Sequence, residues 1–401
     1  MPWKARSALD ERMAFIQEWL KAEVPFAALC RDFQISRQTG YKWLRRYEEE
    51  GERGLQERSR APHHHPQEMT QAVRDAILAV RQNHSRWGPR KLRKTLERQK
   101  PNRRWPANST IGDLLRREGL THPQRKRRRA LPCTLPLQSA EAPNSLWCAD
   151  FKGWFRCGDG SRCDPLTATD AFSRFVLRCQ HVERSDGPRA RAVFEAAFRE
   201  YGLPDSMRTD NGAPFASRAP AGLSRLSIWW IHLGIRHERI QPGCPEQNGQ
   251  HERMHQALKQ ETASPPKANL RKQQEALHRF QQEYNQQRPH EALGYRTPAD
   301  IYVPSSRIYP DRLPEIEYPS AMLLRRVDRT GQISWKHQNV FVSEVLGHEV
   351  VGLQQFEEGL YEVHFGPLLL GWLDTQELCF VADRAPAWHG TRARASESGE
   401  Q

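Results

Sequence analysis

The hydrophobic pattern of the chain changes its period twice. In the first third, apolar residues recur at spacings of three and four, which is the pattern of amphipathic helices. It predicts helices at 25–33, 37–47, 69–83, 88–98 and 109–118. Between 146 and 305, strand-like apolar runs alternate with helical patterns, which indicates a mixed α/β domain. From about 320 the apolar runs shorten and turn signals separate them, which predicts a small β domain.

The α/β region combines five strand candidates with four helix candidates. The strands are predicted at 146–155, 164–169, 175–181, 206–209 and 235–240. The helices are predicted at 187–201, 223–233, 248–259 and 269–287.

The helices at 25–33 and 37–47 have the spacing of a helix-turn-helix unit. Ser36 can cap the second helix, which would bury Trp43 and Leu44. The opposite face would present polar and basic residues to a DNA major groove, namely Arg37, Gln38, Thr39 and Lys42. An ordinary helical hairpin is the alternative, and the basic second helix favours DNA.

Charge separates the first third from the rest of the chain. Residues 1–130 hold 30 Lys and Arg against 15 Asp and Glu, and the remaining residues hold 31 against 33. A polyanionic partner bound mainly by the first third follows from this asymmetry. A run of five cations ends this part and can neutralise phosphates: Arg125, Lys126, Arg127, Arg128 and Arg129. No run of eighteen apolar residues and no signal segment occurs, so we expect a cytoplasmic protein without a membrane partner.

Three acids lie where the pattern predicts regular structure. Asp150 lies inside an apolar strand-like run, where a carboxylate is tolerated poorly without a reason. Asp210 follows a short predicted strand, and Glu252 lies in the first turn of a predicted helix. Together these carboxylates could supply oxygen ligands to two magnesium or manganese ions, the arrangement that serves an in-line phosphoryl displacement.

These motifs make the chain resemble the DDE transposases of bacterial insertion sequences, whose catalytic core is similar to that of retroviral integrases. The matching segments are Trp147-x-x-Asp150, Asp170-Ala171-Phe172-Ser173-Arg174, Thr209-Asp210-Asn211-Gly212, Asn248-Gly249-x-x-Glu252-Arg253 with Lys259, and Tyr284-Asn285 with Arg288-Pro289-His290. The resemblance implies a metal-dependent enzyme that cleaves the ends of its element and joins them to target DNA. It implies double-stranded DNA as partner, a homo-oligomer on DNA, and a bacterial, nucleoid-associated location.

The resemblance also implies a multidomain α+β organisation. Helix-turn-helix units would occupy 1–60 and 66–125, followed by a basic linker at 126–145. A ribonuclease-H-like α/β catalytic core would span 146–305. A small C-terminal β-barrel at 320–382 and a disordered tail at 383–401 would complete the chain.

The identity of the third acid has an alternative. Forty-one residues separate Asp210 from Glu252, whereas integrase-type cores usually have about thirty-five, and Glu246 falls at that shorter spacing. We favour Glu252 because it lies on a predicted helix, whereas the run 242–245 before Glu246 contains two prolines and a glycine. A loop insertion at 216–223 would explain the longer gap. Lys259, two turns after Glu252, could hold a DNA phosphate, and a plain surface lysine is the alternative.

Asp170 is a fourth acid near the predicted strands. We expect it in the hairpin turn, paired with Arg174 and structural rather than catalytic.

Two other functions compete with DNA transposition. His251-Glu252-Arg253-Met254-His255 matches the HExxH motif of zinc proteases, but it leaves Asp150 and Asp210 without a role. A transcription regulator would explain the basic first third and would leave the acids of the core unused. Eight cysteines without a CxxC pair argue against a zinc ribbon.

Overall fold

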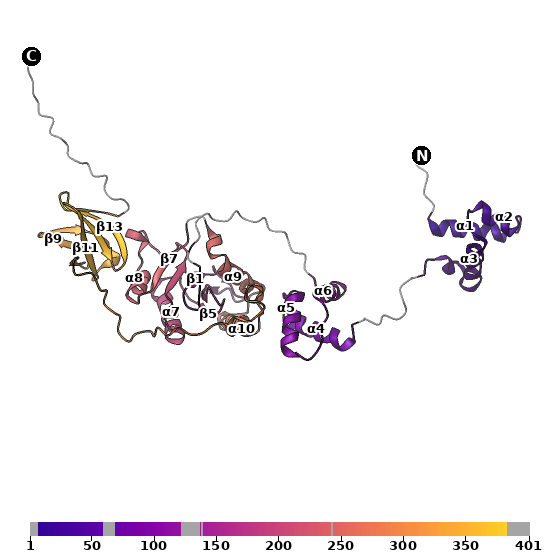
Figure 1. Cartoon of the computed structure of the whole chain (residues 1–401), viewed down its shortest axis with the longest axis horizontal. Helices are drawn as coiled ribbons and strands as arrows, with labels where there is room; N and C mark the ends of the chain where they lie inside the picture. The colour runs from indigo at the N-terminus through magenta and orange to yellow at the C-terminus, as the bar shows by residue number, and fades with distance from the viewer. Residues whose placement is uncertain (1–6, 59–68, 122–136, 138, 242–243, 383–401) are drawn as a thin grey trace, which may run out of the picture. The chain divides into compact units, whose positions relative to one another are not determined.

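The computed structural model of the chain, shown in Figure 1, describes residues 7–58, 69–121, 137, 139–241 and 244–382. It forms two compact units, Met1–Thr70 and Gln71–Gln401. The basic run Arg125–Arg129 and the predicted tail at 383–401 lie outside the described residues.

The first unit is a three-helix helix-turn-helix fold. Its helices are α1 (Ala8–Leu20), α2 (Phe26–Asp32) and α3 (Arg37–Glu50). The Ser36 hydroxyl accepts a hydrogen bond of 3.1 Å from the Thr39 amide, which satisfies a free donor of the first turn of α3, as the sequence predicts.

Helices α2 and α3 approach each other closely at Gly40. A β-carbon there would lie 2.8 Å from the Cys30 sulfur and 2.9 Å from the Phe26 ring, so only glycine fits between the helices. Gln34, in the turn between them, has a left-handed φ of 53°, which is the conformation that favours glycine. The turn between α2 and α3 therefore forms although Gln34 adopts a strained backbone conformation in it.

The helical part of the second unit contains α4 (Gln71–Asn83), α5 (Pro89–Gln99) and α6 (Asn108–Arg117). Each contributes an apolar stripe to a common core that includes Ile77, Leu92 and Ile111, all fully buried. The three helices lie within two residues of the ranges predicted from their periodicity.

The α/β region is built on a five-stranded sheet in the order β5-β4-β1-β6-β7. Its strands are β1 (Trp147–Phe151), β4 (Pro165–Asp170), β5 (Val176–His181), β6 (Ser206–Thr209) and β7 (Arg236–Arg239). The first three strands pair antiparallel, and β1, β6 and β7 run parallel. The central strand β1 is thus paired on both sides.

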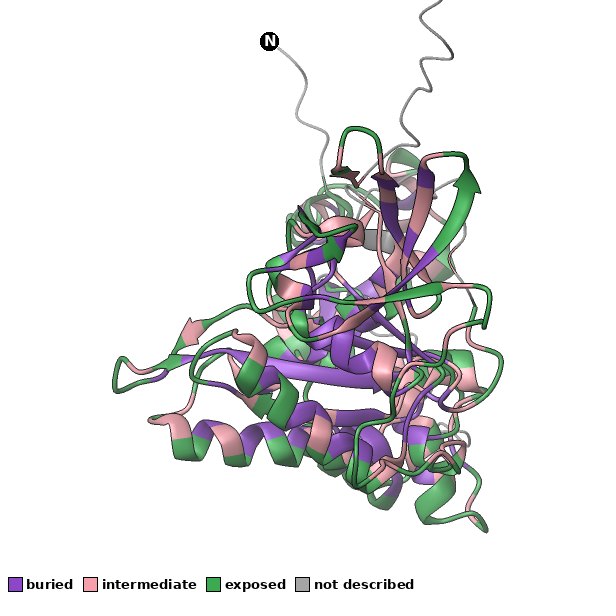
Figure 2. Ribbon diagram, turned by 90° about the vertical axis from the view of Figure 1, so that its left-hand side faces the viewer, coloured by how far each residue is buried: buried purple, intermediate pink, exposed green. Residues whose placement is uncertain are grey.

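Helices cover both faces of this sheet. They are α7 (Gly187–Tyr201), α8 (Arg225–His232), α9 (Gly249–Thr262) and α10 (Leu270–Gln286). Trp147 and Ala149 of β1 pack with α7 and α8, whereas β5 packs its other face against α9 and α10. Figure 2 shows the buried strands between exposed helix faces. Since side chains alternate along a strand, Cys148 and Asp150 share the face toward α9.

The first predicted strand is interrupted. We expected one strand over 146–155, but β1 ends at Phe151 and Phe155 belongs to a separate hairpin of β2 (Phe155–Arg156) and β3 (Arg162–Cys163). Gly153 between them has a φ of 82°, which breaks the extended backbone.

Asp170 is buried at the end of β4, as a structural role requires, but the predicted pairing with Arg174 is wrong. Its fully buried carboxylate accepts hydrogen bonds from the Asn144 amide (2.8 Å), the Ser173 amide (2.8 Å) and the Ser173 hydroxyl (2.5 Å). The Arg174 guanidinium does not pair with it, and only the Arg174 amide bonds to the Asp170 carbonyl (2.9 Å). The Ser173 donors in the turn and the Asn144 amide from before β1 fill the carboxylate instead.

The C-terminal region is a β domain, and the predicted closed barrel is not confirmed. A five-stranded sheet has the order β14-β13-β12-β11-β8, with β8 and β14 at its edges, and a hairpin pairs β9 with β10. The strands are β8 (Leu323–Arg326), β9 (Gln332–Trp335), β10 (Gln338–Phe341), β11 (Val350–Glu357), β12 (Leu360–Phe365), β13 (Leu368–Asp374) and β14 (Cys379–Val381). No pairing between β8 and β14 closes the sheet among these described strands.

Across the described ranges, none of the helices has both the length and the apolar character that crossing a membrane requires.

Asp170→Asn should lower the free energy of unfolding by about 1–3 kcal/mol, because an amide cannot accept all three hydrogen bonds of the buried carboxylate. Urea unfolding measures this loss. Asp311→Asn, which makes the same change on an exposed residue, is the control. Equal stability of the two variants would contradict the structural role of Asp170.

Candidate active site

Two of the three predicted acids lie on β1 and directly after its parallel neighbour β6. Trp147 pairs with Met207 and Cys148 with Arg208, so continuing the register places Asp150 of β1 beside Asp210 at the end of β6. The backbone after β6 is fixed by two hydrogen bonds, from the Gly212 amide to Asp210 Oδ1 (3.1 Å) and from Asn211 Nδ2 to the Ile240 carbonyl (2.6 Å). The turn chemistry of Asp-Asn-Gly therefore holds this carboxylate at the sheet.

The proximity of the two carboxylates has an electrostatic consequence. Burial, and then the negative charge of Asp210, raise the pKa of Asp150 to about 7. Such a pair is unfavourable as two anions, and a divalent cation between them would relieve both the repulsion and the desolvation. The donor set of two half-buried carboxylates therefore fits a hard cation such as magnesium or manganese.

Glu252 is not gathered with this pair. It lies on the exposed side of the first turn of α9, and among the described residues no three His, Cys, Asp or Glu side chains converge as a metal site. Glu246, the alternative, lies in a 3-10 turn, η3 (Pro245–Asn248), rather than in the irregular loop that we expected.

The buried face of α9 carries two histidines that sequence reasoning considered only as zinc ligands. His251 Nε2 and His255 Nε2 lie 2.7 and 2.6 Å from the Thr167 hydroxyl, and His251 Nδ1 lies 2.8 Å from that of Thr169. Burial lowers the pKa of His251 to about 3, and burial likewise lowers that of His255, so both rings are neutral at pH 7. Their ring nitrogens are engaged with the sheet, which disfavours the protease alternative.

His255 also connects α9 to the carboxylates. Its Nδ1 lies 3.7 Å from Asp150 Oδ2, and Thr167, to which it bonds, donates a hydrogen bond of 3.0 Å to the Asp150 carbonyl. Both histidines recur with Met254 and Leu258 at helical spacing, a signal that they face the sheet.

Two lysines, Lys152 and Lys259, lie near Asp150. Lys259 is exposed on α9, and its charge, after the larger effect of burial, lowers the pKa of Lys152, which follows Asp150 by two residues. The sequence predicted Lys259 as a phosphate contact and missed Lys152. A lysine that shortly follows a candidate carboxylate in sequence was the available signal.

The predicted groove-reading residues lie in the first unit. Arg37, Gln38 and Lys42 are exposed on α3, whereas Thr39 is half-buried and its hydroxyl lies 2.9 Å from that of Ser36. Lys42 lies over the Trp43 ring, 4.8 Å from its centroid. The exposed face of α3 is therefore basic and polar, as the sequence predicts.

Family models match most of the described chain. A helix-turn-helix domain matches residues 11–63 and a homeodomain-like domain matches 39–115. Models described as integrase core domain match residues 140–245 and 233–298. The last two matches together include Asp150, Asp210 and Glu252.

Two of the relatives are proteins of insertion elements. An uncharacterized 31.7 kDa protein of element IS407 from Burkholderia multivorans is 27% identical over 59% of this chain and 82% of its own length. An uncharacterized 39.2 kDa protein of IS476 from Xanthomonas euvesicatoria is 28% identical over 59% of this chain and 66% of its own.

Solved structures similar to the chain include the HTLV-2 integrase catalytic core domain in complex with magnesium, which is 19% identical with a TM-score of 0.32 and covers 41% of this chain and 99% of that one. An intasome of simian T-cell lymphotropic virus is 17% identical with a TM-score of 0.36 over 73% of this chain and 97% of that one. The chain thus carries helix-turn-helix and integrase core domains and is similar to proteins encoded by insertion elements, and these findings support a DDE transposase of an insertion sequence, which is a polynucleotidyl transferase.

Proposed function

We propose that this transposase binds the ends of its own insertion element, cleaves them in a metal-dependent reaction and transfers them to target DNA. The observation that carries the proposal is the pair of carboxylates on β1 and β6, since Asp150 is held beside Asp210 at a raised pKa. Substrates are then two double-stranded DNAs, the element end and the target. A homo-oligomer assembled on DNA, associated with the nucleoid, would bring two ends together.

Asp150 and Asp210 would hold magnesium or manganese, and Glu252 would complete the ligand set from α9. Bound metal ions of this kind activate a water or a 3′ hydroxyl as nucleophile and stabilise the leaving oxygen. Glu252 is exposed on the first turn of α9, so its carboxylate is accessible from solvent. This assignment requires Glu252 to approach the pair when metal and DNA are bound.

The neighbouring residues orient the carboxylates and the strand. His255, neutral and fixed by Thr167, limits the rotamers of Asp150 from one side. Lys152 and Lys259 place two positive charges near Asp150, where they would bind a phosphate of the DNA strand. Arg37, Gln38 and Lys42 would contact the element end through the major groove, and Thr39 would act chiefly as part of the cap.

Asp150→Asn and Asp210→Asn should each abolish cleavage and joining while binding to element ends is unchanged. Each change removes one negative ligand without altering the separate helix-turn-helix unit. Sequencing the DNA that flanks the gene supplies the end sequence, and gel assays in magnesium measure cleavage. Near-normal joining by either variant would show that the triad is assigned wrongly.

The third acid is tested with two isosteric changes. Glu252→Gln should eliminate cleavage, because it removes the carboxylate that α9 would contribute to the metal ligands. Glu246→Gln should retain most activity and serves as the matched control. Circular dichroism verifies that both variants are folded. The reverse outcome would then assign the role of third carboxylate to Glu246.

A fragment of residues 1–130 should bind element ends on its own, with affinity that falls steeply as salt rises. This part carries 30 basic against 15 acidic residues. Each phosphate neutralised contributes about −0.9 to the slope of log affinity on log salt. Fluorescence anisotropy at several salt concentrations measures the slope, and a slope near zero would refute the assignment.

A further inference from the structure

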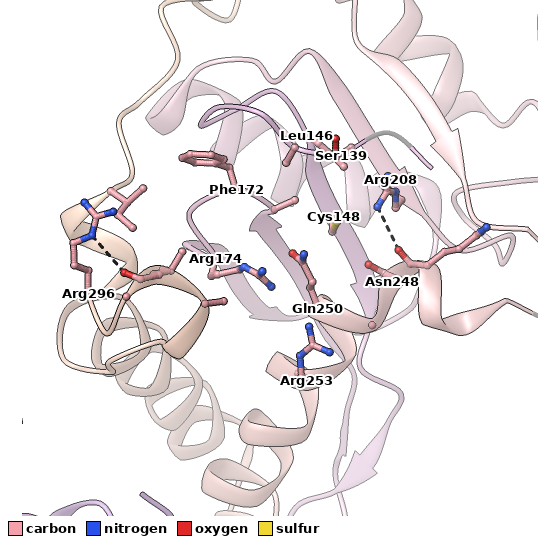
Figure 3. A pocket seen from close by; sticks show the side chains of 18 residues that line it. Ser139, Leu146, Cys148, Phe172, Arg174, Arg208, Asn248, Gln250, Arg253 and Arg296 are labelled. Carbon is pink, nitrogen blue, oxygen red and sulfur yellow. Dashed lines mark hydrogen bonds between the residues drawn. The ribbon is translucent and has the colours of Figure 1, made fainter. Parts of the chain in front are cut away.

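A concave pocket of about 820 Å³ lies at the N-terminal end of α9, on the sheet face that also carries Asp150. Cys148 of β1 and Arg208 of β6 form part of its wall. Figure 3 shows side chains from the β4–β5 turn, from α9 and from the loop after α10 pointing into it. Its volume is in the range of pockets that hold a whole small ligand.

The pocket contains positive charge without a matching acid. Arg174 and Arg253 both line it, and no described acidic side chain pairs with either guanidinium. Arg174 Nε is buried without a hydrogen-bond partner, and burial followed by the charge of Arg253 lowers the pKa of Arg174. Arg208 also lines the pocket but pairs with Glu238 at 2.8 Å. Two adjacent unpaired guanidinia in a cavity are stabilised by a bound anion.

The remaining wall suits a nucleobase rather than a bare anion. Phe172, from the β4–β5 turn, is 37% exposed on the pocket wall and offers an aromatic face. Asn248 Oδ1 is buried without a hydrogen-bond partner, and Gln250 extends its amide into the same space. Aromatic faces stack on bases, and amides bond to base edges.

We propose that this pocket holds one unpaired nucleotide of the DNA strand that lies in the active site. Arg174 and Arg253 would bind its phosphate, Phe172 would stack on its base, and Asn248 with Gln250 would bond to the base edge. A base within a duplex stack cannot enter a concave pocket, so the nucleotide must be unpaired.

The position of the pocket relates it to the reaction. Cys148 precedes Asp150 by two residues on the same strand face, a separation of about 7 Å. Arg208 precedes Asp210 by the same two residues on β6. A nucleotide in the pocket would therefore lie next to the strand segment at the carboxylates. The proposal rests on the proposed function, because it takes the DNA strand at Asp150 as given.

The test compares binding of the full chain to two DNA duplexes in EDTA, where no cleavage occurs. One duplex has blunt ends, and the other is identical except for a two-nucleotide single-stranded extension. Fluorescence anisotropy should show about five-fold or greater preference for the extended duplex, since stacking of one base gives at least this factor. Contacts of the helix-turn-helix unit are the same in both and cancel in the ratio.

Phe172→Ala and Arg253→Gln should each reduce this ratio toward one, and both residues are exposed, so the fold should be retained. Arg271→Gln is the matched control, since this exposed arginine of α10 is outside the pocket and pairs with Glu275. Equal binding of both duplexes by the unaltered chain would overturn the proposal. So would an Arg253→Gln effect of equal size on both duplexes, which would assign Arg253 to the duplex backbone.

Failure of the pocket and failure of the proposed function give different results. Asp150→Asn should keep the preference for the extended duplex and lose cleavage in magnesium. A chain that shows the preference without any cleavage would contradict the proposed function and leave the pocket assignment standing. Cleavage without the preference would remove the pocket and leave the proposed function.

Discussion

The repulsion between two carboxylates is the interaction on which the core depends. Parallel pairing of β1 and β6 puts Asp150 next to Asp210. Burial and the neighbouring negative charge make the ionised form of Asp150 unfavourable, which raises its pKa to about 7. A fold that only needed stability would place an apolar residue here, because Cys148, the neighbour of Asp150 on the same face of β1, is buried. The unfavourable pair therefore supports the proposal that these carboxylates are functional and hold a cation, which would make their proximity favourable.

Helix α9 packs on the same face of the sheet as this pair, and hydrogen bonds to β4 fix its orientation. Thr167 and Thr169 place hydroxyls on the neighbouring strand, and these need buried partners. His251 and His255 supply them, which fixes the rotation of α9 about its axis. Since the histidines point inward, Glu252 and Lys259 must lie on exposed faces of the helix. The polar network thus decides which residues of α9 are exposed to solvent.

The sequence predicted most elements of the fold because periodicity and caps are local. Ser36 caps α3, and the strands before Asp210 and around Asp150 are where the apolar runs place them. It failed where a single backbone conformation decides, as at Gly153, which separates β1 from the next hairpin. The C-terminal strands were recognisable, but whether a sheet closes depends on pairing between its edges, which strand patterns do not encode.

Side-chain partners were predicted less well than elements, because several donors compete for one acceptor. Asp170 was expected to pair with Arg174, yet two backbone amides and the Ser173 hydroxyl saturate its carboxylate. A turn satisfies an acid with donors that are already in place, whereas a guanidinium must lose rotamer entropy to reach it. Arg174 is thereby left unpaired and lies in the pocket beside Arg253. The wrong pairing and the candidate nucleotide site have the same physical cause, because the donors of Ser173 and Asn144 that saturate Asp170 also leave Arg174 without an acid.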